Sequence, residues 1–442
     1  METHSLRTVG IVSLGCSKNR VDSERMMGFL TREGFVLTNN PREADVLIVN
    51  TCGFIESAKQ ESINTILEMA AYKEIGRCRK LVVTGCLSER YRRELPPELP
   101  EVDLWLGVRE YETLAGLLRG TGARSKDYCY GERVLSTPSH YAYLRVADGC
   151  NNRCTYCAIP AIRGPYVSRP FDEVVAEAEE LVARGAKELV VIAQDTTRYG
   201  TDLPEGRRLL APLLRRLAET DAQWIRVLYA YPDEIDKELL DAMDSSEKIV
   251  RYVDIPLQHA DDTVLRRMNR RGTHEELCAL MEEFRRRDPR YILRTTFMVG
   301  FPGETEEQFE TLCRFVREHP FDRMGVFTYS PEEGTPAAEF DGAVPEEEKQ
   351  RRADVLMRIQ QEVSKDLNEA RVGKTYAILV EGFDHRSRKY FGRSYGEAAE
   401  IDGKVIFSAQ KEHEIGEFVP VRITKALEYD LIGEEESNES AQ

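Results

Sequence analysis

Three cysteines stand close together in the middle of the chain, and their spacing could hold an iron–sulfur cluster. The stretch Asp148-Gly-Cys-Asn-Asn-Arg-Cys-Thr-Tyr-Cys157 contains Cys150, Cys154 and Cys157 in the pattern C-x3-C-x2-C. Three thiolates this close can bind one [4Fe–4S] cube from a single loop. A zinc site or a closed ferredoxin site needs a fourth ligand nearby, and no cysteine follows within the loop. We therefore expect a cube with one open iron; a zinc knuckle or unrelated cysteines are the alternatives.

An open iron in this position has a well-defined use. The loop follows the first strand of a predicted barrel, at the strand end where active sites collect. Tyr156 precedes the last cysteine, and in this the loop resembles that of enzymes that bind S-adenosylmethionine (SAM) at such an iron. An electron from the cube then breaks a carbon–sulfur bond of SAM and releases a 5′-deoxyadenosyl radical, which takes hydrogen from an unactivated carbon. These residues predict a [4Fe–4S] cluster and SAM as cofactors.

Three further cysteines are far apart in sequence but share one local context. Cys16 follows Ser-Leu-Gly, Cys52 follows Val-Asn-Thr, and Cys86 follows Val-Thr-Gly, each just past a predicted parallel strand. Such strand ends share one edge of a doubly wound sheet, so the three thiols can meet there and bind a second cluster. Its free iron could hold a sulfur atom for donation. The alternative is three inert buried residues at strand ends. The remaining cysteines share no context and are interpreted as structural: Cys78, Cys129, Cys278 and Cys313.

The elements that must position these loops fall into three predicted units. Residues 1–130 alternate buried strand-like runs with helix-like stretches, which predicts a doubly wound parallel sheet. Polar residues at 120–126 mark its boundary. The strand-like runs are 9–14, 46–50 and 81–84, and the helix-like stretches include 22–33 and 56–71.

Residues 136–371 repeat the alternation of strands and helices. Six strand–helix units predict a complete or partial (β/α) barrel, and a charged helix at 345–371 ends the unit. The predicted strands are 142–146, 188–193, 224–229, 252–256, 294–299 and 323–329, with amphipathic helices such as 171–184, 273–287 and 305–318 between them.

Residues 372–437 change character to short strands separated by glycines. Candidate strands at 376–381, 404–407 and 418–423 predict a small OB-like β-barrel. The tail 438–442 is acidic and polar, so we expect it to be disordered.

The overall composition indicates the compartment and the kind of partner. No apolar run approaches the ~20 residues of a membrane span, and the polar N-terminus is unlike a secretory signal, so we expect a cytoplasmic protein. In that reducing compartment the ten cysteines are more typical of metal ligands or reactive thiols than of disulfides. The 61 Lys and Arg against 77 Asp and Glu give a net charge of −16, which suits a basic protein partner better than nucleic acid.

Two polar stretches at barrel strand ends are weaker candidates for SAM binding. Gln194, Asp195 and Thr196 end the second strand, where they either form a hydrogen-bonding rim or cap a helix through Asp195 or Thr196. Gln258 and His259 end the fourth strand. A single histidine is more often structural, but its place at the barrel top favours a role in the site.

Other motifs also have two interpretations. Gly300-Phe-Pro-Gly-Glu-Thr305 either approaches SAM closely or forms a turn with Thr305 as a helix cap. The arginines at 266–271 and 285–287 are most simply solvated helix faces. Basic and aromatic residues alternate at 386–393, as in RNA binders. Against this, residues 372–442 hold 9 Lys and Arg and 14 Asp and Glu, which favours a basic protein partner.

These residues together resemble the methylthiotransferase family of radical SAM enzymes. The resemblance covers nearly the whole chain, in the order N-terminal methylthiotransferase domain, radical SAM barrel and TRAM domain. One departure is Ser17, where relatives more often carry proline; it follows a proposed ligand and is not one. The matching stretches are Ser13-Leu-Gly-Cys-Ser-Lys-Asn19, Asn50-Thr-Cys-Gly-Phe-Ile-Glu-Ser57, Ala193-Gln-Asp-Thr-Thr-Arg-Tyr-Gly200, Asp254-Ile-Pro-Leu-Gln-His-Ala260 and Tyr329-Ser-Pro-Glu-Glu-Gly-Thr-Pro336.

The resemblance implies a reaction, a substrate and partners. It implies that the 150–157 triplet holds the SAM cluster, that Cys16, Cys52 and Cys86 hold an auxiliary cluster, and that SAM serves once as methyl donor and once as radical source. The best match is the branch that methylthiolates the β-carbon of an aspartate in small-subunit ribosomal protein S-twelve, free or on the subunit. The resemblance implies an electron donor such as flavodoxin or ferredoxin as a further partner, and tRNA is not expected as a substrate. The alternatives are a tRNA methylthiotransferase and a non-catalytic iron–sulfur electron carrier.

Overall fold

The N-terminal unit is a parallel sheet whose central strands are buried on both faces. A computed structural model describes residues 6–121 and 132–436. The strand order β2-β1-β3-β4-β5 confirms the predicted doubly wound sheet, and apolar side chains pack on each face. Two edge strands of two residues each were not predicted, because they are too short to show a period. The strands are β1 (Thr8–Ser13), β2 (Val36–Leu37), β3 (Val46–Thr51), β4 (Lys80–Gly85) and β5 (Leu104–Trp105).

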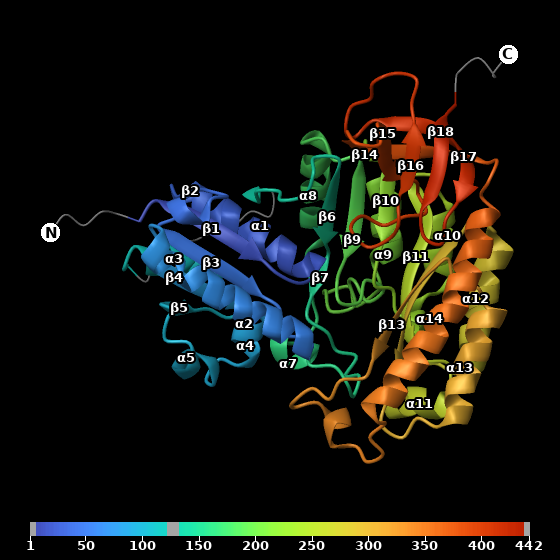
Figure 1. The fold of residues 1–442 in the computed structure, drawn as a ribbon, viewed down its shortest axis with the longest axis horizontal. Helices are drawn as coiled ribbons and strands as arrows, with labels where there is room; N and C mark the ends of the chain where they lie inside the picture. The colour runs from blue at the N-terminus through green and yellow to red at the C-terminus, as the bar shows by residue number, and fades with distance from the viewer. Residues whose placement is uncertain (1–5, 122–131, 437–442) are drawn as a thin grey trace.

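The helices of this unit pack on both sides of the sheet (Figure 1). The first helix begins at Ser17 rather than at residue 22, because Cys16 already takes the extended N-cap conformation. The helices are α1 (Ser17–Arg32), α2 (Glu56–Ala70), α3 (Tyr72–Ile75), α4 (Cys86–Arg90), α5 (Leu95–Glu98) and α6 (Leu114–Leu118). The predicted boundary at 120–126 lies outside the described residues from residue 122 on. The predicted tail at 438–442 and Cys129 lie wholly outside them.

The central unit is an open parallel sheet that curves into a partial barrel, which confirms the partial form of the predicted barrel. Its strand order is β13-β12-β11-β10-β9-β6, so β6 and β13 are its two edges. The strands are β6 (Tyr141–Arg145), β9 (Glu188–Ile192), β10 (Trp224–Val227), β11 (Ile249–Gln258), β12 (Ile292–Val299) and β13 (Arg323–Thr328). A short hairpin, β7 (Ala147–Asp148) with β8 (Val167–Ser168), flanks the cysteine loop.

Helices cover the outer face of this barrel, and none of the helices within 6–121 and 132–436 is long and apolar enough to cross a membrane. Because side chains alternate along a strand, Leu189 and Val191 pack outward on the helices while Val190 and Ile192 point to the barrel interior. The helices are α7 (Ile159–Arg163), α8 (Phe171–Ala183), α9 (Leu210–Ala218), α10 (Lys237–Asp244), α11 (Asp262–Arg267), α12 (His274–Arg287), α13 (Glu306–Glu318) and α14 (Glu346–Glu369).

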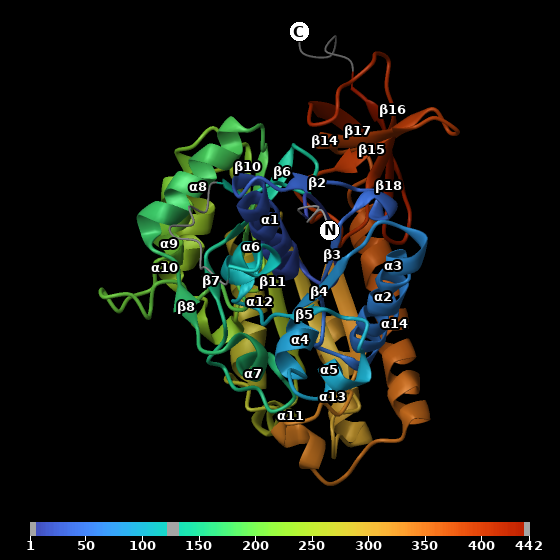
Figure 2. The ribbon, with the colours of Figure 1, turned by 90° about the vertical axis from the view of Figure 1, so that its left-hand side faces the viewer.

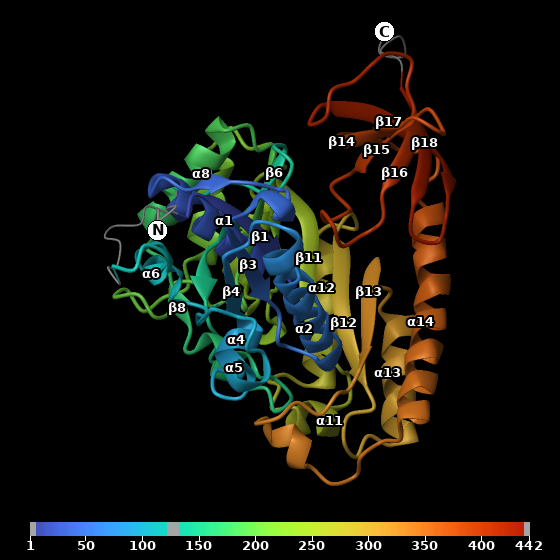
Figure 3. The same cartoon turned by 60° about the vertical axis from the view of Figure 1, so that its left-hand side comes forward.

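The C-terminal unit is a closed five-stranded barrel at the end of α14 (Figure 3). This confirms the predicted small β-barrel, although two of its strands were not predicted. Strand β15 carries the basic motif that was compared with RNA binders, and β18 is rich in glutamate. The strands are β14 (Thr375–Asp384), β15 (Lys389–Arg393), β16 (Val405–Ser408), β17 (Phe418–Ala426) and β18 (Leu431–Glu435).

Buried ion pairs fasten the C-terminal unit to the amino end of the central barrel. Glu188, the first residue of β9, is fully buried and accepts hydrogen bonds from Arg226 (2.6 Å) and pairs with Arg393 of β15 (2.7 Å). Burial alone raises the pKa of Glu188, but Arg393 and Arg226 outweigh burial and hold it below its usual range. Tyr252 adds a hydrogen bond to Asp402 at 2.7 Å. The amino end of the barrel is therefore closed, which leaves the carboxyl end for chemistry.

The substitution Glu188→Ala should destabilise the protein by about 3 kcal/mol, because it leaves the buried guanidinium of Arg226 without a carboxylate and removes one of the two that pair with Arg393. Chemical denaturation at neutral pH measures the change. The matched control is Glu180→Ala on the exposed face of α8, which should stay within about 0.5 kcal/mol of wild type. Equal stability of the two variants would contradict this account of the interface.

Candidate functional site

The cysteine loop (149–158) is held between the central barrel and the turn after α11. The backbone N–H of Cys150 donates to the carbonyl of Gly164 at 3.1 Å, and the hydroxyl of Thr155 donates to the carbonyl of Arg267 at 2.8 Å. The backbone of Arg153 takes a positive φ of 52°, which reverses the chain between the first two cysteines. These contacts bring three half-buried, free thiols together: Cys150, Cys154 and Cys157.

The thiols of this loop lie close enough together to raise one another's pKa. Burial raises the pKa of Cys157 to about 12, and the neighbouring thiols of Cys154 and Cys150 add to the rise. Burial likewise raises the pKa of Cys150. A site that gathers thiols and disfavours their ionisation fits a cationic iron cluster that would bind them as thiolates.

The second group of cysteines converges at the carboxyl edge of the N-terminal sheet, as the sequence predicts. A Cβ on Gly15, whose φ is +85°, would lie 2.9 Å from Cβ and 3.1 Å from Sγ of Cys52, so glycine is needed next to Cys16. Burial raises the pKa of Cys86 to about 12; Arg163 opposes this rise, and Cys16 and Cys52 add to it. The three thiols are therefore mutual neighbours, and they too fit an iron–sulfur cluster.

Neither triad matches a site for a single ion. Among residues 6–121 and 132–436, no three His, Cys, Asp or Glu side chains lie close enough to share one metal ion. Each thiolate of a cube binds a different iron, so the ligands of a cluster are more widely spaced than those of a mononuclear zinc site.

A buried arginine lies between the two triads. Nη2 of Arg163 donates to Oδ1 of Asn19 (2.6 Å) and to Oδ2 of Asp22 (2.9 Å) and lies 3.7 Å from Sγ of Cys86. Its Nη1 donates to Oδ1 of Asp148 (3.1 Å), two residues before the first cysteine of the loop. Helices α4 and α7, which begin or end at these groups, lie side by side in Figure 2. The guanidinium therefore joins Cys86 of one candidate cluster site to Asp148, the residue just before the cysteine loop of the other.

Two of the predicted SAM-binding residues lie beside the cysteine loop. Gln194 donates to Asp148 at 3.1 Å, and Asp195 accepts from Asn152 of the loop at 2.8 Å. The hydroxyl of Thr196 donates instead to the carbonyl of Leu228, so it fastens β9 to β10. No helix begins here in the described chain, where α9 starts at Leu210, so the alternative of a helix cap is wrong.

The other predicted residues differ in their surroundings. Gln258 ends β11 with a positive φ of 72°. His259 is fully buried, where its Nδ1 accepts from the backbone of Asp261 and its Nε2 lies 3.7 Å from Glu304. These contacts favour the structural interpretation of this histidine. Thr305 forms a capping box at the start of α13, which confirms the cap interpretation of that motif.

Tyr156 and Arg270 pack behind the cysteine loop. Tyr156 lies in an apolar cluster with Met268, Phe301 and Tyr329. The prediction that Arg270 belongs to a solvated helix face is wrong. Its side chain is buried, with the residue 7% exposed, and its Nη1 lies 3.9 Å from Sγ of Cys154. No local pattern could reveal this, because Arg270 follows a helix of only six residues.

The motif at 329–336 connects the N-terminal unit to the cysteine loop. Glu332 is almost fully buried and accepts hydrogen bonds from Arg90 of α4 (2.8 Å) and Lys59 of α2 (3.2 Å). Just beyond the motif, the N–H of Ala337 donates to the carbonyl of Thr155 at 2.9 Å. The motif therefore holds the two cysteine-bearing units against each other.

Three family models match the chain in succession. Residues 8–107 match Uncharacterized protein family UPF0004, residues 144–316 match the Radical SAM superfamily, and residues 372–435 match the TRAM domain. The three matches follow the three structural units.

Curated relatives match over nearly their whole length. The chain is 47% identical over 446 residues to the ribosomal protein uS12 methylthiotransferase RimO of Acetivibrio thermocellus, with 97% of this chain and 98% of that protein covered. It is 48% identical to the protein of the same name from Clostridium tetani, with 96% and 97% covered.

Solved structures share the fold at low identity. The radical S-adenosylmethionine methyltransferase TsrM from Kitasatospora setae, with cobalamin and a [4Fe–4S] cluster bound, gives a TM-score of 0.56 at 14% identity over 75% of this chain and 74% of that one. The cobalamin-dependent S-adenosylmethionine radical enzyme OxsB gives 0.52 at 12% identity, covering 80% and 56%.

The substitution Glu332→Ala should lower the free energy of unfolding by about 3 kcal/mol, because it leaves the buried Arg90 without a carboxylate and leaves Lys59 paired with Glu56 alone. Urea denaturation measures the change. The matched control is Glu333→Ala at the adjacent exposed position, which should change stability by less than about 0.5 kcal/mol. If both variants unfold like wild type, Glu332 does not hold the two units together.

Proposed function

The chain belongs to the RimO family of ribosomal protein uS12 methylthiotransferases, and we propose that it adds a methylthio group to the β-carbon of an aspartate in uS12. It is a radical SAM transferase that uses [4Fe–4S] clusters and SAM. The observation that carries the proposal is the pair of cysteine triads on two different units, joined by the guanidinium of Arg163. A chemistry that needs both a radical and a donated sulfur requires two such sites facing one space.

The residue assignments belong to this proposal. Cys150, Cys154 and Cys157 hold the SAM cluster, and Cys16, Cys52 and Cys86 hold the auxiliary cluster. When bound, the first cluster and SAM supply a hydrogen-abstracting radical, and the second cluster supplies a sulfur that another SAM methylates. Gln194 and Asp195 line the rim of the SAM site, supported by their bonds to Asp148 and Asn152.

The side chains of the protein fix the distance between the two cluster sites and exclude water from the space where the radical forms. Arg163 is almost fully buried and satisfies its donors on Asn19, Asp22 and Asp148, so the two sites cannot drift apart without unpairing buried charge. Burial of this network also keeps solvent away from a radical that would otherwise react with it.

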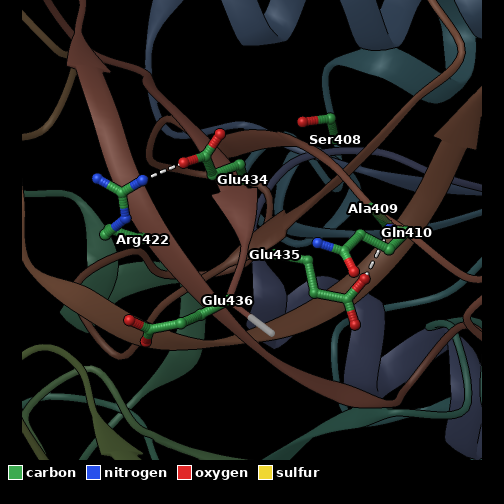
Figure 4. Close-up of a pocket in the computed structure, with 7 residues that line it drawn as sticks. All are labelled: Ser408, Ala409, Gln410, Arg422, Glu434, Glu435 and Glu436. Atoms are coloured by element: carbon green, nitrogen blue, oxygen red, sulfur yellow. Dashed lines mark hydrogen bonds and ion pairs between the residues drawn. The ribbon is translucent and has the colours of Figure 1, made fainter. Parts of the chain in front are cut away.

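The partner we propose is the basic protein substrate rather than tRNA. In the basic motif on β15, Arg393 is 2% exposed and paired with Glu188 and Glu381, so it cannot contact phosphate; Arg386 and Arg388 stay exposed. A pocket of about 350 Å³ on the same unit presents acidic side chains instead (Figure 4). Its lining includes Glu435, Glu436 and Glu434, of which Glu434 pairs with Arg422 of the same pocket. Carboxylates of this kind complement lysine and arginine on a ribosomal protein.

We also place the reaction in the cytoplasm, where ribosomes are assembled. Reductive cleavage of SAM needs one electron from outside the chain, and a flavodoxin or ferredoxin is the class of donor we propose.

Cysteine substitutions should separate the two sites. Cys150→Ala should abolish reductive cleavage of SAM, whereas Cys52→Ala should lose methylthio transfer and keep some SAM cleavage. Iron should fall from about eight per chain to about four in each variant, because each substitution removes one cube. Anaerobic reconstitution with iron analysis and detection of 5′-deoxyadenosine provide the measurements.

Cys278→Ala on α12 is the matched control and should keep about eight irons and full activity, since Cys278 lies on a helix of the outer layer. Full methylthio transfer by the Cys52 variant would refute the auxiliary site.

Deletion of the gene should remove the methylthio mark from uS12 and leave tRNA nucleosides unchanged. Mass spectrometry of ribosomal proteins and of digested tRNA from the same cells makes the comparison. Loss of a mark on tRNA alone would instead support the tRNA methylthiotransferase.

A further inference from the structure

A buried lysine of the N-terminal unit faces the central barrel without a carboxylate partner. Lys18 is in the first turn of α1, two residues after Cys16, and is 7% exposed. Its ammonium lies 2.9 Å from the centroid of the Tyr229 ring. Within 6–121 and 132–436, the ammonium contacts this aromatic face, and neither a hydrogen-bond acceptor nor an acidic side chain pairs with it.

The neighbouring cations are paired with acidic side chains. Arg20 on the same helix pairs with Glu400 at 3.0 Å, and Arg163 pairs with Asp22. Arg294 of β12 donates to Asp254 at 2.6 Å. Since a buried charge without a partner is costly, an ammonium left over in such a paired environment indicates that its anion arrives from outside.

The ring beneath Lys18 is held in place by a strained backbone. Tyr229 has a φ of +63°, which is unfavourable for a tyrosine and persists only where neighbours enforce it. Its N–H donates to Oδ2 of Asp254 (3.1 Å), and its carbonyl accepts from the N–H of Thr196 (3.0 Å). Thr196 directly follows Asp195, which is bonded to the cysteine loop. The lysine and the ring are thus fixed relative to both cysteine triads.

We propose that Lys18 binds the side-chain carboxylate of the substrate aspartate, with the Tyr229 ring beneath its ammonium. The inference rests on the proposed function and names a substrate-binding residue for it. The carboxylate is bonded directly to the β-carbon, so holding it positions the C–H bond that must react. It also rejects an asparagine, whose neutral amide cannot neutralise the ammonium.

The test uses reconstituted protein and two peptides that span the uS12 aspartate and differ only in carrying Asp or Asn at that position. Fluorescence anisotropy gives the dissociation constants. Wild type should bind the Asp peptide about tenfold or more tightly than the Asn peptide, as expected for a hydrogen bond between charged groups. Lys18→Met should lose this preference by weakening the Asp peptide alone, and Lys18→Arg, which keeps the charge, should retain most of it.

Lys237→Met is the matched control. Lys237 lies on the exposed surface of α10, where it pairs with Asp241, and its substitution should leave both constants unchanged. Iron content equal to wild type in the Lys18 variants shows that α1 and the neighbouring cluster site are intact.

Three results would overturn the inference. One is a Lys18→Met variant that keeps the wild-type preference for Asp. Another is a higher KM for SAM in peptide-free SAM cleavage by that variant, since the lysine would then face SAM. The third is wild-type protein that modifies neither peptide; this would overturn the proposed function and the inference with it, whereas the first two leave the proposed function standing.

Discussion

The arrangement of the molecule depends on a buried charge network at the junction of its first two units. Asp22 of α1 accepts from both Arg145 of β6 (2.5 Å) and Arg163 of α7 (2.9 Å), and Arg163 also binds Asp148. Burial raises the pKa of Asp148, but Arg163 and Arg145 outweigh it and hold the pKa below its usual range. Each charge is desolvated, so the network is stable only in the geometry that pairs all its members. That geometry places one guanidinium against Cys86 of one triad and against Asp148, which precedes the cysteine loop of the other.

The two ends of the central barrel differ in what they contact and in their backbone conformation. At the amino end, Glu188 and Tyr252 bind residues of the C-terminal unit, and apolar side chains of that unit pack into the barrel. At the carboxyl end, the strands finish in residues with unusual backbone, such as Tyr229 and Gln258. Buried ion pairs thus close one end of the barrel, whereas strained backbone at Tyr229 and Gln258 marks the other end.

Much of the fold and part of the site could be predicted from local patterns. The long buried strands β3 and β9 have an apolar run or alternation that is visible in the sequence itself. Short strands such as β2 and β5 have no such pattern and form only because a neighbouring strand offers unpaired backbone groups. The basic motif at 386–393 was ambiguous for the same reason, because the burial of Arg393 depends on Glu188, a residue of another unit.

The sequence by itself determined the chemistry: two sets of three cysteines, each after a strand, and three units in a fixed order. These features are encoded in spacing and periodicity along the chain, which do not depend on how the units meet. The tertiary structure alone decided that Arg163 joins the triads, that Arg270 lies behind Cys154, and that Lys18 meets Tyr229. The partners in these contacts are distant in sequence, and the burial of a charge is a property of the surfaces that come together around it.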